Sequence, residues 1–561
     1  MKSRYLLHHL VSFSAQENPE AIALTCHGRS MDYLALANSC QGFGRFLRAR
    51  NIRRQDRIAI FLEKRTEFVI ACFGTAAASN IFVPVNPILK KDQAKHILVD
   101  SGAKVLITSR GRFELFDPSD FEVLDLEIIV LADDETGSEG IKTSSRLKNR
   151  HHREIQTFEW KDLQATGRET SFSAEEFEHS LGPMVDTDAV GILYTSGSTG
   201  RPKGVVLSHR NMVFGAKSVA SYLENVSSDV LLAVLPLSFD AGFSQLTTAF
   251  FVGARVCLLD YMAPRDILSL VMSEKITGLT AVPPLWNQIA ALKWPDSVTK
   301  HLRYFANTGG RMPLELLKKL RQHFPLTKPF LMYGLTESFR STYLPPDQVD
   351  RIPDSIGKAI PNAEVLVLRD DGTPCDPGEP GELVHRGALV GLGYWNDPEK
   401  TKEKYRNLPL SSQSRPQEII LPEVCVFSGD IVKKDNDGFI FFIGRNDEMI
   451  KSSGYRISPM EIEEVVGSSG CVFEVLAFGV PHESLGQNIV VSVVLDDAVI
   501  STPEEGREKI LEHCRKIMPL YMVPADILVR SSPHPRNQNG KLDRPSVRQE
   551  YMLSQAKEGA I

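Results

Sequence analysis

The chain has 561 residues, of which 42% are hydrophobic and 8% aromatic, and its 64 Lys and Arg against 70 Asp and Glu give a formal charge of −6. This composition excludes disordered and fibrous classes, and the length suggests about three or four domain-sized units. The slightly acidic balance argues against a broad nucleic-acid-binding surface, which needs an excess of Lys and Arg to contact phosphates.

The eight cysteines are spread singly, with no CxxC pair and no Cys/His cluster at metal-ligand spacing, so free thiols in a reducing compartment are expected. No apolar run reaches the roughly 18 to 20 residues of a membrane-spanning helix. Two histidines interrupt the apolar stretch near the N-terminus, which argues against a signal peptide. These features predict a cytoplasmic protein without a transmembrane segment.

Helical and strand-like patterns alternate between residues 7 and 130. Helices are predicted over 33–50, 68–78 and 93–100, and strands over 57–62, 82–85 and 103–108. This alternation indicates βαβ units and a largely parallel sheet. From 133 to about 180 the sequence is charged and poor in apolar positions, which predicts an exposed insertion or mobile loop; a pair of polar surface helices is the alternative.

Alternation resumes at 189 and continues to about 331. Glycine, proline and aspartate then separate short strands at 364–368, 381–385 and 438–444, which predicts a β-rich subdomain, with a polar loop at 407–417. Beyond Gly444 an α/β pattern returns for about 115 residues, enough for a small separate domain. The predicted fold class is α/β, with parallel αβαβ sheets in the large N-terminal part and a small α+β C-terminal part.

A segment rich in Ser, Thr and Gly carries the clearest chemical signal. A strand at 191–195 runs into this loop, Lys203 follows, and after a short strand Ser208 stands where a helix N-cap is expected. Such a loop can direct backbone N–H groups and hydroxyls at phosphate oxygens, and Lys203 adds a point charge. It is not a Walker A motif, because no Gly-Lys-Ser/Thr opens a helix; a flexible surface turn is the alternative.

Five motifs in order resemble those of the adenylate-forming superfamily, which contains AMP-forming acyl-CoA synthetases, amino-acid adenylation enzymes and luciferases. They are the phosphate loop at 195–204, the aromatic-Gly-x-Thr-Glu motif at 333–337, the ribose motif at 428–430, the hinge motif at 444–463 and the catalytic-lysine motif at 539–541. Segments 82–91 and 449–459 are similar to stand-alone bacterial acyl-CoA ligases of exosortase or exopolysaccharide clusters, and 539–544 is similar to peptide synthetases.

The resemblance implies a two-step reaction. A carboxylic acid is activated with ATP to an acyl-adenylate, and the acyl group then passes to a pantetheine thiol of CoA or of a carrier protein. It also implies two domains, an AMP-binding domain at 1–446 and a mobile C-terminal lid domain at 447–561, which rotate about the hinge residue Asp447. After rotation the region of Gly454 would line the channel for the thiol.

The same resemblance assigns the nucleotide site. Thr336 would contact phosphate and Glu337 would bind Mg²⁺, for which a carboxylate oxygen is a suitable ligand. Asp430 would accept the ribose hydroxyls, and Lys541 would stabilise the charge that develops on the carboxylate and α-phosphate. The remaining nucleotide contacts would come from Thr195, Ser196, Gly197, Ser198, Thr199, Gly200, Lys203, Gly309, Gly310, Tyr333 and Arg445.

Two residues bear on the acid. Asp240 stands where amino-acid adenylation enzymes carry an aspartate that pairs with the substrate amine, although Gly242 replaces the usual serine. Because a carboxylate without a cation is costly to bury, Asp240 makes a purely fatty acid less attractive; a water-bridged structural aspartate is the alternative. Arg340 could hold a second carboxylate, so an amino dicarboxylic acid would satisfy both residues.

Other functions remain open on the sequence alone. The acid could be fatty or aryl, as in acyl-CoA synthetases, and the acceptor could differ, as in acyl-AMP ligases or luciferase-like oxidation. A catalytically inactive AMP-binding scaffold is the alternative from another class, which the presence of Lys203, Glu337, Asp430 and Lys541 argues against. A small carboxylic or amino acid and a free acyl carrier protein are the expected partners, with no nucleic acid.

Overall fold

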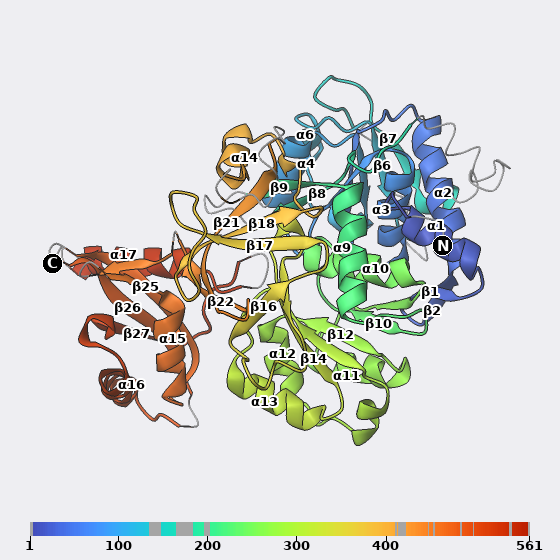
Figure 1. Cartoon of the computed structure of the whole chain (residues 1–561). Helices are drawn as coiled ribbons and strands as arrows, with labels where there is room; N and C mark the ends of the chain where they lie inside the picture. The colour runs from blue at the N-terminus through green and yellow to red at the C-terminus, as the bar shows by residue number, and fades with distance from the viewer. Residues whose placement is uncertain are drawn as a thin grey trace. The chain divides into compact units, whose positions relative to one another are not determined.

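The chain forms two compact units, shown in the computed structural model of Figure 1. The first contains residues 1–365, 385–408 and 416–426, and the second contains 366–384, 409–415 and 427–561. The boundary predicted from the sequence, between 446 and 447, separates two domains that are expected to rotate relative to each other. It stays a prediction. The structure describes residues 4–133, 147–163, 183–195, 202–409, 412, 422–446, 448–452, 455–482, 485–496, 499–537 and 541–558.

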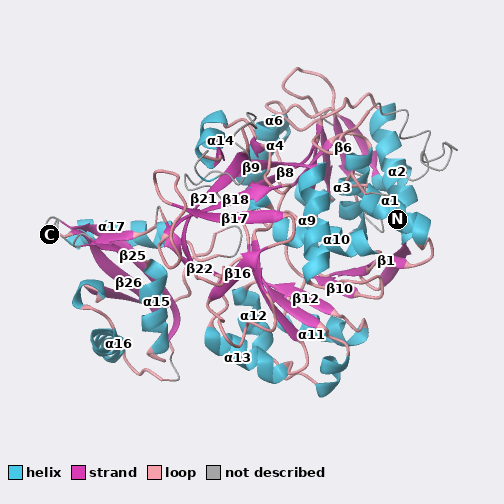
Figure 2. Ribbon diagram, viewed as in Figure 1, coloured by secondary structure: helices cyan, strands magenta, loops and turns pink. Residues whose placement is uncertain are grey.

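One sheet of the first unit carries parallel strands in its centre. Strands β1, β11, β10, β12, β13 and β14 are parallel, and β2, β15 and β16 join it antiparallel. Parallel neighbours need a crossover, and helices supply it, as predicted. Figure 2 shows helices α11, α12 and α13 in the same part of the molecule as β12. The order is β16 (Ser355–Ala359), β15 (Thr342–Leu344), β14 (Lys328–Tyr333), β13 (Tyr304–Asn307), β12 (Gly278–Ala281), β10 (Val230–Ala233), β11 (Arg255–Leu258), β1 (Ile22–Cys26) and β2 (Arg29–Asp32).

A second sheet is also mostly parallel, and only its β8–β9 and β9–β19 pairs are antiparallel. The six helices and strands predicted between residues 33 and 108 are confirmed to within two residues at each end. The order is β19 (Gly393–Tyr394), β9 (Lys203–Ser208), β8 (Ala189–Thr195), β4 (Ile81–Pro84), β3 (Arg57–Phe61), β5 (Val105–Thr108), β6 (Ile128–Leu131) and β7 (Gln156–Glu159).

Buried aromatic side chains join helices and strands into one core. The ring of Phe243 lies 5.0 Å from that of Phe82 on β4 and 6.0 Å from that of Phe73 on α3, and all three side chains are buried. The helices of this unit are α1 (His9–Glu17), α2 (Tyr33–Ala49), α3 (Thr66–Ala77), α4 (Lys91–Ser101), α5 (Arg110–Phe113), α6 (Pro118–Phe121), α9 (His209–Tyr222), α10 (Asp240–Val252), α11 (Pro264–Ser273), α12 (Pro283–Ala290), α13 (Leu314–His323) and α14 (Pro398–Lys404).

The polar stretch after residue 133 is not wholly an exposed insertion. Its described part, 147–163, contributes strand β7 to the second sheet and buries Ile155 and Trp160. The prediction was wrong here because few apolar residues suffice for a short edge strand. Residues 134–146 and 164–182, and most of the polar loop predicted at 407–417, lie outside the described residues.

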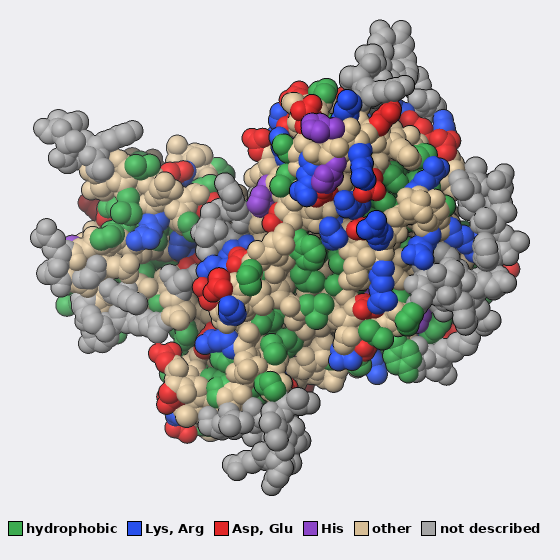
Figure 3. Space-filling view, turned by 90° about the horizontal axis from the view of Figure 1, so that it is seen from above, with side chains coloured by type: hydrophobic (Ala, Val, Ile, Leu, Met, Phe, Trp, Pro, Cys, Tyr) green, Lys and Arg blue, Asp and Glu red, His purple; other side chains and the backbone are tan. Residues whose placement is uncertain are grey.

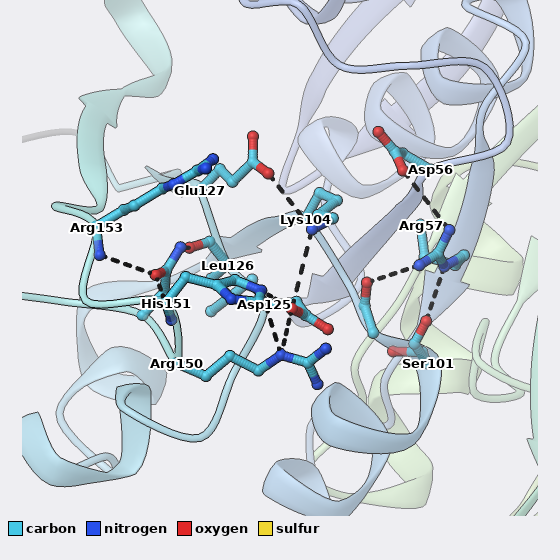
Figure 4. A network of polar contacts seen from close by, with 12 residues as sticks. Asp56, Arg57, Ser101, Lys104, Asp125, Leu126, Glu127, Arg150, His151 and Arg153 are labelled. Atoms are coloured by element: carbon cyan, nitrogen blue, oxygen red, sulfur yellow. Dashed lines mark hydrogen bonds and ion pairs between the residues drawn. The ribbon is translucent and has the colours of Figure 1, made fainter.

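Charged side chains around this stretch neutralise one another (Figure 4). Asp125 lies 2.7 Å from Arg150, 3.2 Å from His151 and 3.9 Å from Lys104, and Lys104 also lies 3.4 Å from Glu127. On the face drawn in Figure 3, Lys and Arg side chains likewise lie among Asp and Glu side chains. Lys and Arg side chains paired in this way are less available to a polyanion than a stripe of Lys and Arg side chains without acidic partners would be.

The second unit combines two groups of strands with three helices, α15 (Pro459–Ser468), α16 (Pro503–Ile517) and α17 (Arg544–Glu558). Its C-terminal part is the predicted α+β fold, in which β27 (Asp526–Arg530) runs parallel to β26 (Gly486–Leu495) and the other strands are antiparallel. The remaining strands of that sheet are β25 (Val472–His482), β23 (Ile450–Ser452) and β24 (Tyr455–Ile457).

The predicted β-rich segment forms the other group of strands. The order is β17 (Ala363–Leu368), β18 (Gly381–Gly387), β21 (Val424–Lys434) and β22 (Ile440–Arg445), and β20 (Tyr405–Asn407) pairs with the beginning of β21. Residues 366–384 and 427–445 of this group belong to the same compact unit as the C-terminal residues. The sequence predicted the whole group as part of the N-terminal domain. Within the described ranges, no helix has the length and apolar character needed to cross a membrane.

Candidate active site

The residues that flank the Gly-rich loop lie opposite each other. Strands β8 and β9 are antiparallel, and their register pairs Thr195 with Lys203. Ser208 ends β9 and caps α9, since its Oγ accepts a hydrogen bond from the Asn211 N–H at 3.2 Å. The predicted N-cap is therefore confirmed. The five loop residues Ser196, Gly197, Ser198, Thr199 and Gly200 lie outside the described residues.

A second group lies at the carboxyl ends of two parallel strands. Strand β13 ends at Asn307 beside β14, which ends at Tyr333. Gly309 has φ +73°, a conformation that favours glycine, and the Asn307 side chain donates a hydrogen bond to the Gly310 carbonyl at 2.7 Å. The turn and Tyr333 thus share one sheet edge, the position at which open α/β sheets bind ligands.

The Thr-Glu motif forms a strained turn. Thr336–Ser338 is a short 3₁₀ helix, and Phe339 follows with φ 58°, which is uncommon for a bulky residue. The Phe339 side chain is fully buried against α9, where a Cβ added to Gly215 would lie 2.4 Å from its ring. The sequence analysis missed Phe339, because residue type gave no signal of this backbone conformation.

A tyrosine connects the predicted Mg²⁺ ligand with the predicted phosphate lysine. The Tyr394 hydroxyl donates to Glu337 Oε1 at 2.5 Å, and Lys203 Nζ lies 5.8 Å from the centre of the Tyr394 ring. The pairing of β19 with β9, in which Tyr394 faces Val205, produces this arrangement. Tyr394 was also missed, because it is 57 residues from Glu337 in sequence and only the tertiary structure joins them.

The chemistry of Glu337 fits a magnesium ion. No group of three or more His, Cys, Asp or Glu side chains in the described part of the chain is arranged to hold a metal. Mg²⁺ is commonly held by one or two carboxylates together with substrate phosphates, rather than by an all-protein cage. Glu337 and Lys203, which both contact Tyr394, supply a carboxylate and a cation for such a site.

The two predicted acid-binding residues contact each other. Arg340 Nη1 lies 2.7 Å from Asp240 Oδ2, and the Thr336 hydroxyl donates to Asp240 Oδ1 at 3.1 Å. Arg340 is only 2% exposed. Gly242, which departs from the family pattern, fits a close approach, since a Cβ there would lie 2.0 Å from the Pro236 carbonyl oxygen.

In the second unit, Asp430 and Arg445 form a cross-strand pair. They are opposite on β21 and β22, and Arg445 Nη1 lies 3.7 Å from Asp430 Oδ1. Asp430 is 8% exposed. The structure therefore brings together the predicted ribose ligand Asp430 and the predicted nucleotide contact Arg445. The predicted hinge residue Asp447 and thiol-channel residue Gly454 lie outside the described residues.

Lys541 is exposed at the end of a turn. Arg536 and Leu542 form a bridge, and the Lys541 N–H donates to Asn537 Oδ1 at 3.1 Å. Close by in sequence, Arg544 pairs with Glu463 at 2.7 Å and also with Glu448. Arg544 therefore ties the segment that follows Lys541 to the residue next to the predicted hinge.

Comparisons with known proteins agree with these motifs. The chain is 29% identical over 545 residues to a long-chain-fatty-acid–CoA ligase of Yersinia pestis, covering 93% of this chain and 90% of the relative. It is 25% identical over 544 residues to gramicidin S synthase 2 of Aneurinibacillus migulanus, covering 96% of this chain and 11% of that protein. The O-succinylbenzoate coenzyme A synthetase of Bacillus subtilis in complex with ATP and magnesium ion superposes with a TM-score of 0.75 at 25% identity, covering 96% and 98% of the two chains.

Two family models also match the chain. The model described as AMP-binding enzyme matches residues 11–395, more than half of the chain, and the model described as AMP-binding enzyme C-terminal domain matches 461–541. These matches span both compact units. The chain therefore belongs to the AMP-binding enzymes, as an ATP-dependent, AMP-forming ligase that converts a carboxylic acid to an acyl-adenylate and then to a thioester.

Proposed function

We propose that this enzyme is an acyl-CoA ligase for a fatty or aryl acid whose acyl group carries no charge. The ion pair between Asp240 and Arg340 carries this proposal. The sequence argument for an amino acid was that a buried Asp240 would need a substrate cation. Arg340 provides that cation within the protein, so no ammonium group is required to offset the burial of the carboxylate.

We assign the residues of the first unit to phosphate and metal. Adenylation brings a carboxylate to the α-phosphate and expels pyrophosphate, so the protein must chiefly position and neutralise anions. Lys203 and Thr336, with the loop at 195–200, would hold the departing phosphates. Glu337 would hold Mg²⁺, which supplies charge neutralisation when bound. Tyr333 would stack on adenine beside Gly309 and Gly310.

In the second unit, Lys541 is the proposed catalytic cation, and Asp430 and Arg445 are the proposed ribose contacts. Exposure on a turn leaves the Lys541 ammonium group accessible to an anionic substrate. The Arg544–Glu448 contact ties residue 448 to helix α17, and we propose Asp447, directly before residue 448, as the pivot.

We propose CoA, rather than a carrier protein, as the thiol acceptor. Supporting this, the Yersinia ligase is matched over nearly its whole length, whereas the gramicidin synthase match covers 11% of that protein. A hollow of about 320 Å³ in the second unit is lined by Ser452, Leu485 and Tyr521. Of these, Ser452 is close in sequence to Gly454. This hollow is a candidate surface for the pantetheine arm. A cytoplasmic location stays a prediction.

An ATP–pyrophosphate exchange panel tests the choice of acid. Fatty, aryl, amino and amino dicarboxylic acids are compared for wild type and for Asp240→Asn. We expect exchange with uncharged acyl groups, and we expect Asp240→Asn to impair it because Arg340 then lacks its partner. Exchange confined to amino acids, lost in Asp240→Asn, would instead restore the substrate-amine role of Asp240.

A further inference from the structure

A small cavity of about 20 Å³ lies on the buried side of Arg340. Helices α9 and α10 and strands β10, β12, β13 and β14 surround it, and its lining includes Gln245, Thr248 and Arg340. One water molecule needs about 10 to 15 Å³ of such space, so the cavity has room for about one oxygen atom with its hydrogens. Ala241, which follows Asp240, also lines it, so the cavity adjoins the Asp240–Arg340 pair.

Three buried polar atoms of these lining residues have no hydrogen-bond partner among the residues that the structure describes: Gln245 Oε1, Thr248 Oγ1 and Arg340 Nε. These residues are 7%, 2% and 2% exposed, respectively. Gln245 Nε2 donates to the Leu232 carbonyl at 2.9 Å, which fixes the amide so that Oε1 is the remaining acceptor. Buried polar groups are rarely left unpaired, so a polar group, either an ordered water or an oxygen of a ligand, is expected in the cavity.

We propose that this cavity is a recognition site for a hydroxyl group on the acyl chain of the substrate acid. A hydroxyl donates one hydrogen bond and accepts two. It can donate to Gln245 Oε1 and accept from Arg340 Nε–H, while the Thr248 hydroxyl takes either role. A keto oxygen only accepts and would leave Gln245 Oε1 unpaired, and a methylene group would leave all three atoms unpaired.

Arg340 has two functions in this arrangement. Its Nη1 neutralises Asp240, and its Nε–H is directed at the neutral oxygen of the acid. A second carboxylate in the cavity would bring another negative charge near Asp240, so an uncharged oxygen is preferred. This inference rests on the proposed activation of acids with uncharged acyl groups, and it narrows them to hydroxylated ones.

The test compares matched acids. ATP–pyrophosphate exchange is measured with octanoate and its monohydroxy isomers and with benzoate and its monohydroxy isomers. We expect one hydroxylated isomer to exceed its parent acid in kcat/KM by at least about tenfold, because the parent acid would leave the buried polar groups unpaired. Thr248→Val should remove most of that preference, and Thr248→Ser, which keeps the hydroxyl, should retain it.

The neighbouring Thr247 provides a matched control. It is a fully buried threonine of the same helix, but its hydroxyl donates to the Ser244 carbonyl at 3.3 Å and it does not line the cavity. Thr247→Val should leave the preference unchanged, and Tm values show whether each variant folds. Equal activity of hydroxylated and parent acids, or a preference unaffected by Thr248→Val, overturns the inference while the proposed function stands. Absence of exchange with every uncharged acid overturns both.

Discussion

At the residue scale, the contact between Tyr394 and Glu337 is a positioning device for the predicted metal ligand. One hydroxyl hydrogen bond fixes the carboxylate, and the same ring faces Lys203. Carboxylates that bind metals are usually oriented by such outer hydrogen bonds, whose loss typically costs 10- to 100-fold in metal affinity or activity.

Tyr394→Phe removes this hydrogen bond and keeps the ring. We expect the Mg²⁺ concentration for half-maximal exchange to rise about tenfold, and direct titration of Mn²⁺ with a non-hydrolysable ATP analogue to show weaker binding. Tyr405→Phe is the control, because the buried Tyr405 hydroxyl has no hydrogen-bond partner among the described residues. An unchanged Mg²⁺ requirement in Tyr394→Phe would show that Tyr394 contributes packing alone and does not orient Glu337.

A buried histidine near the Thr-Glu turn makes stability depend on pH. Burial lowers the pKa of His385 to about 4, and its Nδ1 lies 3.1 Å from Ser341 Oγ. Since the unfolded chain takes up a proton near pH 6.5, stability is lost as pH falls from there toward 4. Between pH 7.5 and pH 5, the titration of His385 lowers the free energy of unfolding by about 2 kcal/mol.

His385→Asn removes the titration and keeps a polar atom near Ser341. We expect the drop in Tm between pH 7.5 and pH 5 to be smaller in His385→Asn than in wild type. Burial also lowers the pKa of His209, so part of the drop should remain in the variant. The same drop in both proteins would contradict the assignment to His385.

At the element scale, helix α9 supports the turn that carries the Thr-Glu motif. Phe339 has a positive φ, and its ring packs on Gly215, where α9 has no side chain. The same helix begins at the Ser208 cap directly after β9. One helix therefore positions both the strand that carries Lys203 and the turn that carries Thr336 and Glu337.

Gly215→Ala should push on the Phe339 ring. Although alanine favours a helix by about 1 kcal/mol, overpacking typically costs 1–3 kcal/mol. We expect a lower Tm together with weaker adenylate formation, measured by calorimetry and pyrophosphate release. Gly467→Ala in α15, where nothing lies within 4 Å of an added Cβ, should raise stability slightly without changing activity. A similar effect of both substitutions would contradict the role of the contact.

At the scale of the whole molecule, the predicted catalytic groups are divided between two compact units. Lys203, Thr336 and Glu337 belong to the first unit, and Asp430, Arg445 and Lys541 belong to the second. Asp430 and Arg445 precede the predicted hinge residue Asp447, and Lys541 follows it. A rotation about Asp447 would therefore move Lys541 relative to the other groups and let different residues act in successive half-reactions.

Lys541→Ala tests that division. We expect adenylate formation to fall at least a hundredfold with ATP binding largely retained, because the ammonium group stabilises charge that develops only in the transition state. Transfer from a supplied acyl-adenylate to CoA should remain near wild type. Lys516→Ala, which removes an exposed lysine paired with Glu512 on α16, is the control and should change neither step. Unchanged single-turnover adenylation in Lys541→Ala would overturn its role.

The sequence by itself determined the elements and the reaction class. Alternation of strand and helix patterns predicted the βαβ order, because local periodicity depends on nearest neighbours along the chain. Motifs at 195–204, 333–337 and 428–430 indicated nucleotide chemistry, because short stretches carry those groups. The sequence pattern also predicted the cap at Ser208, which acts within three residues.

Only the tertiary structure decided which side chains meet. Asp240 and Arg340 were predicted separately for a substrate, yet they pair across 100 positions of sequence. The Tyr394–Glu337 contact and the unpaired atoms of Gln245, Thr248 and Arg340 likewise depend on strands and helices distant in the chain. Long-range packing sets these distances, and no local pattern encodes them. The proposal for the acid therefore rests on contacts that only the fold creates.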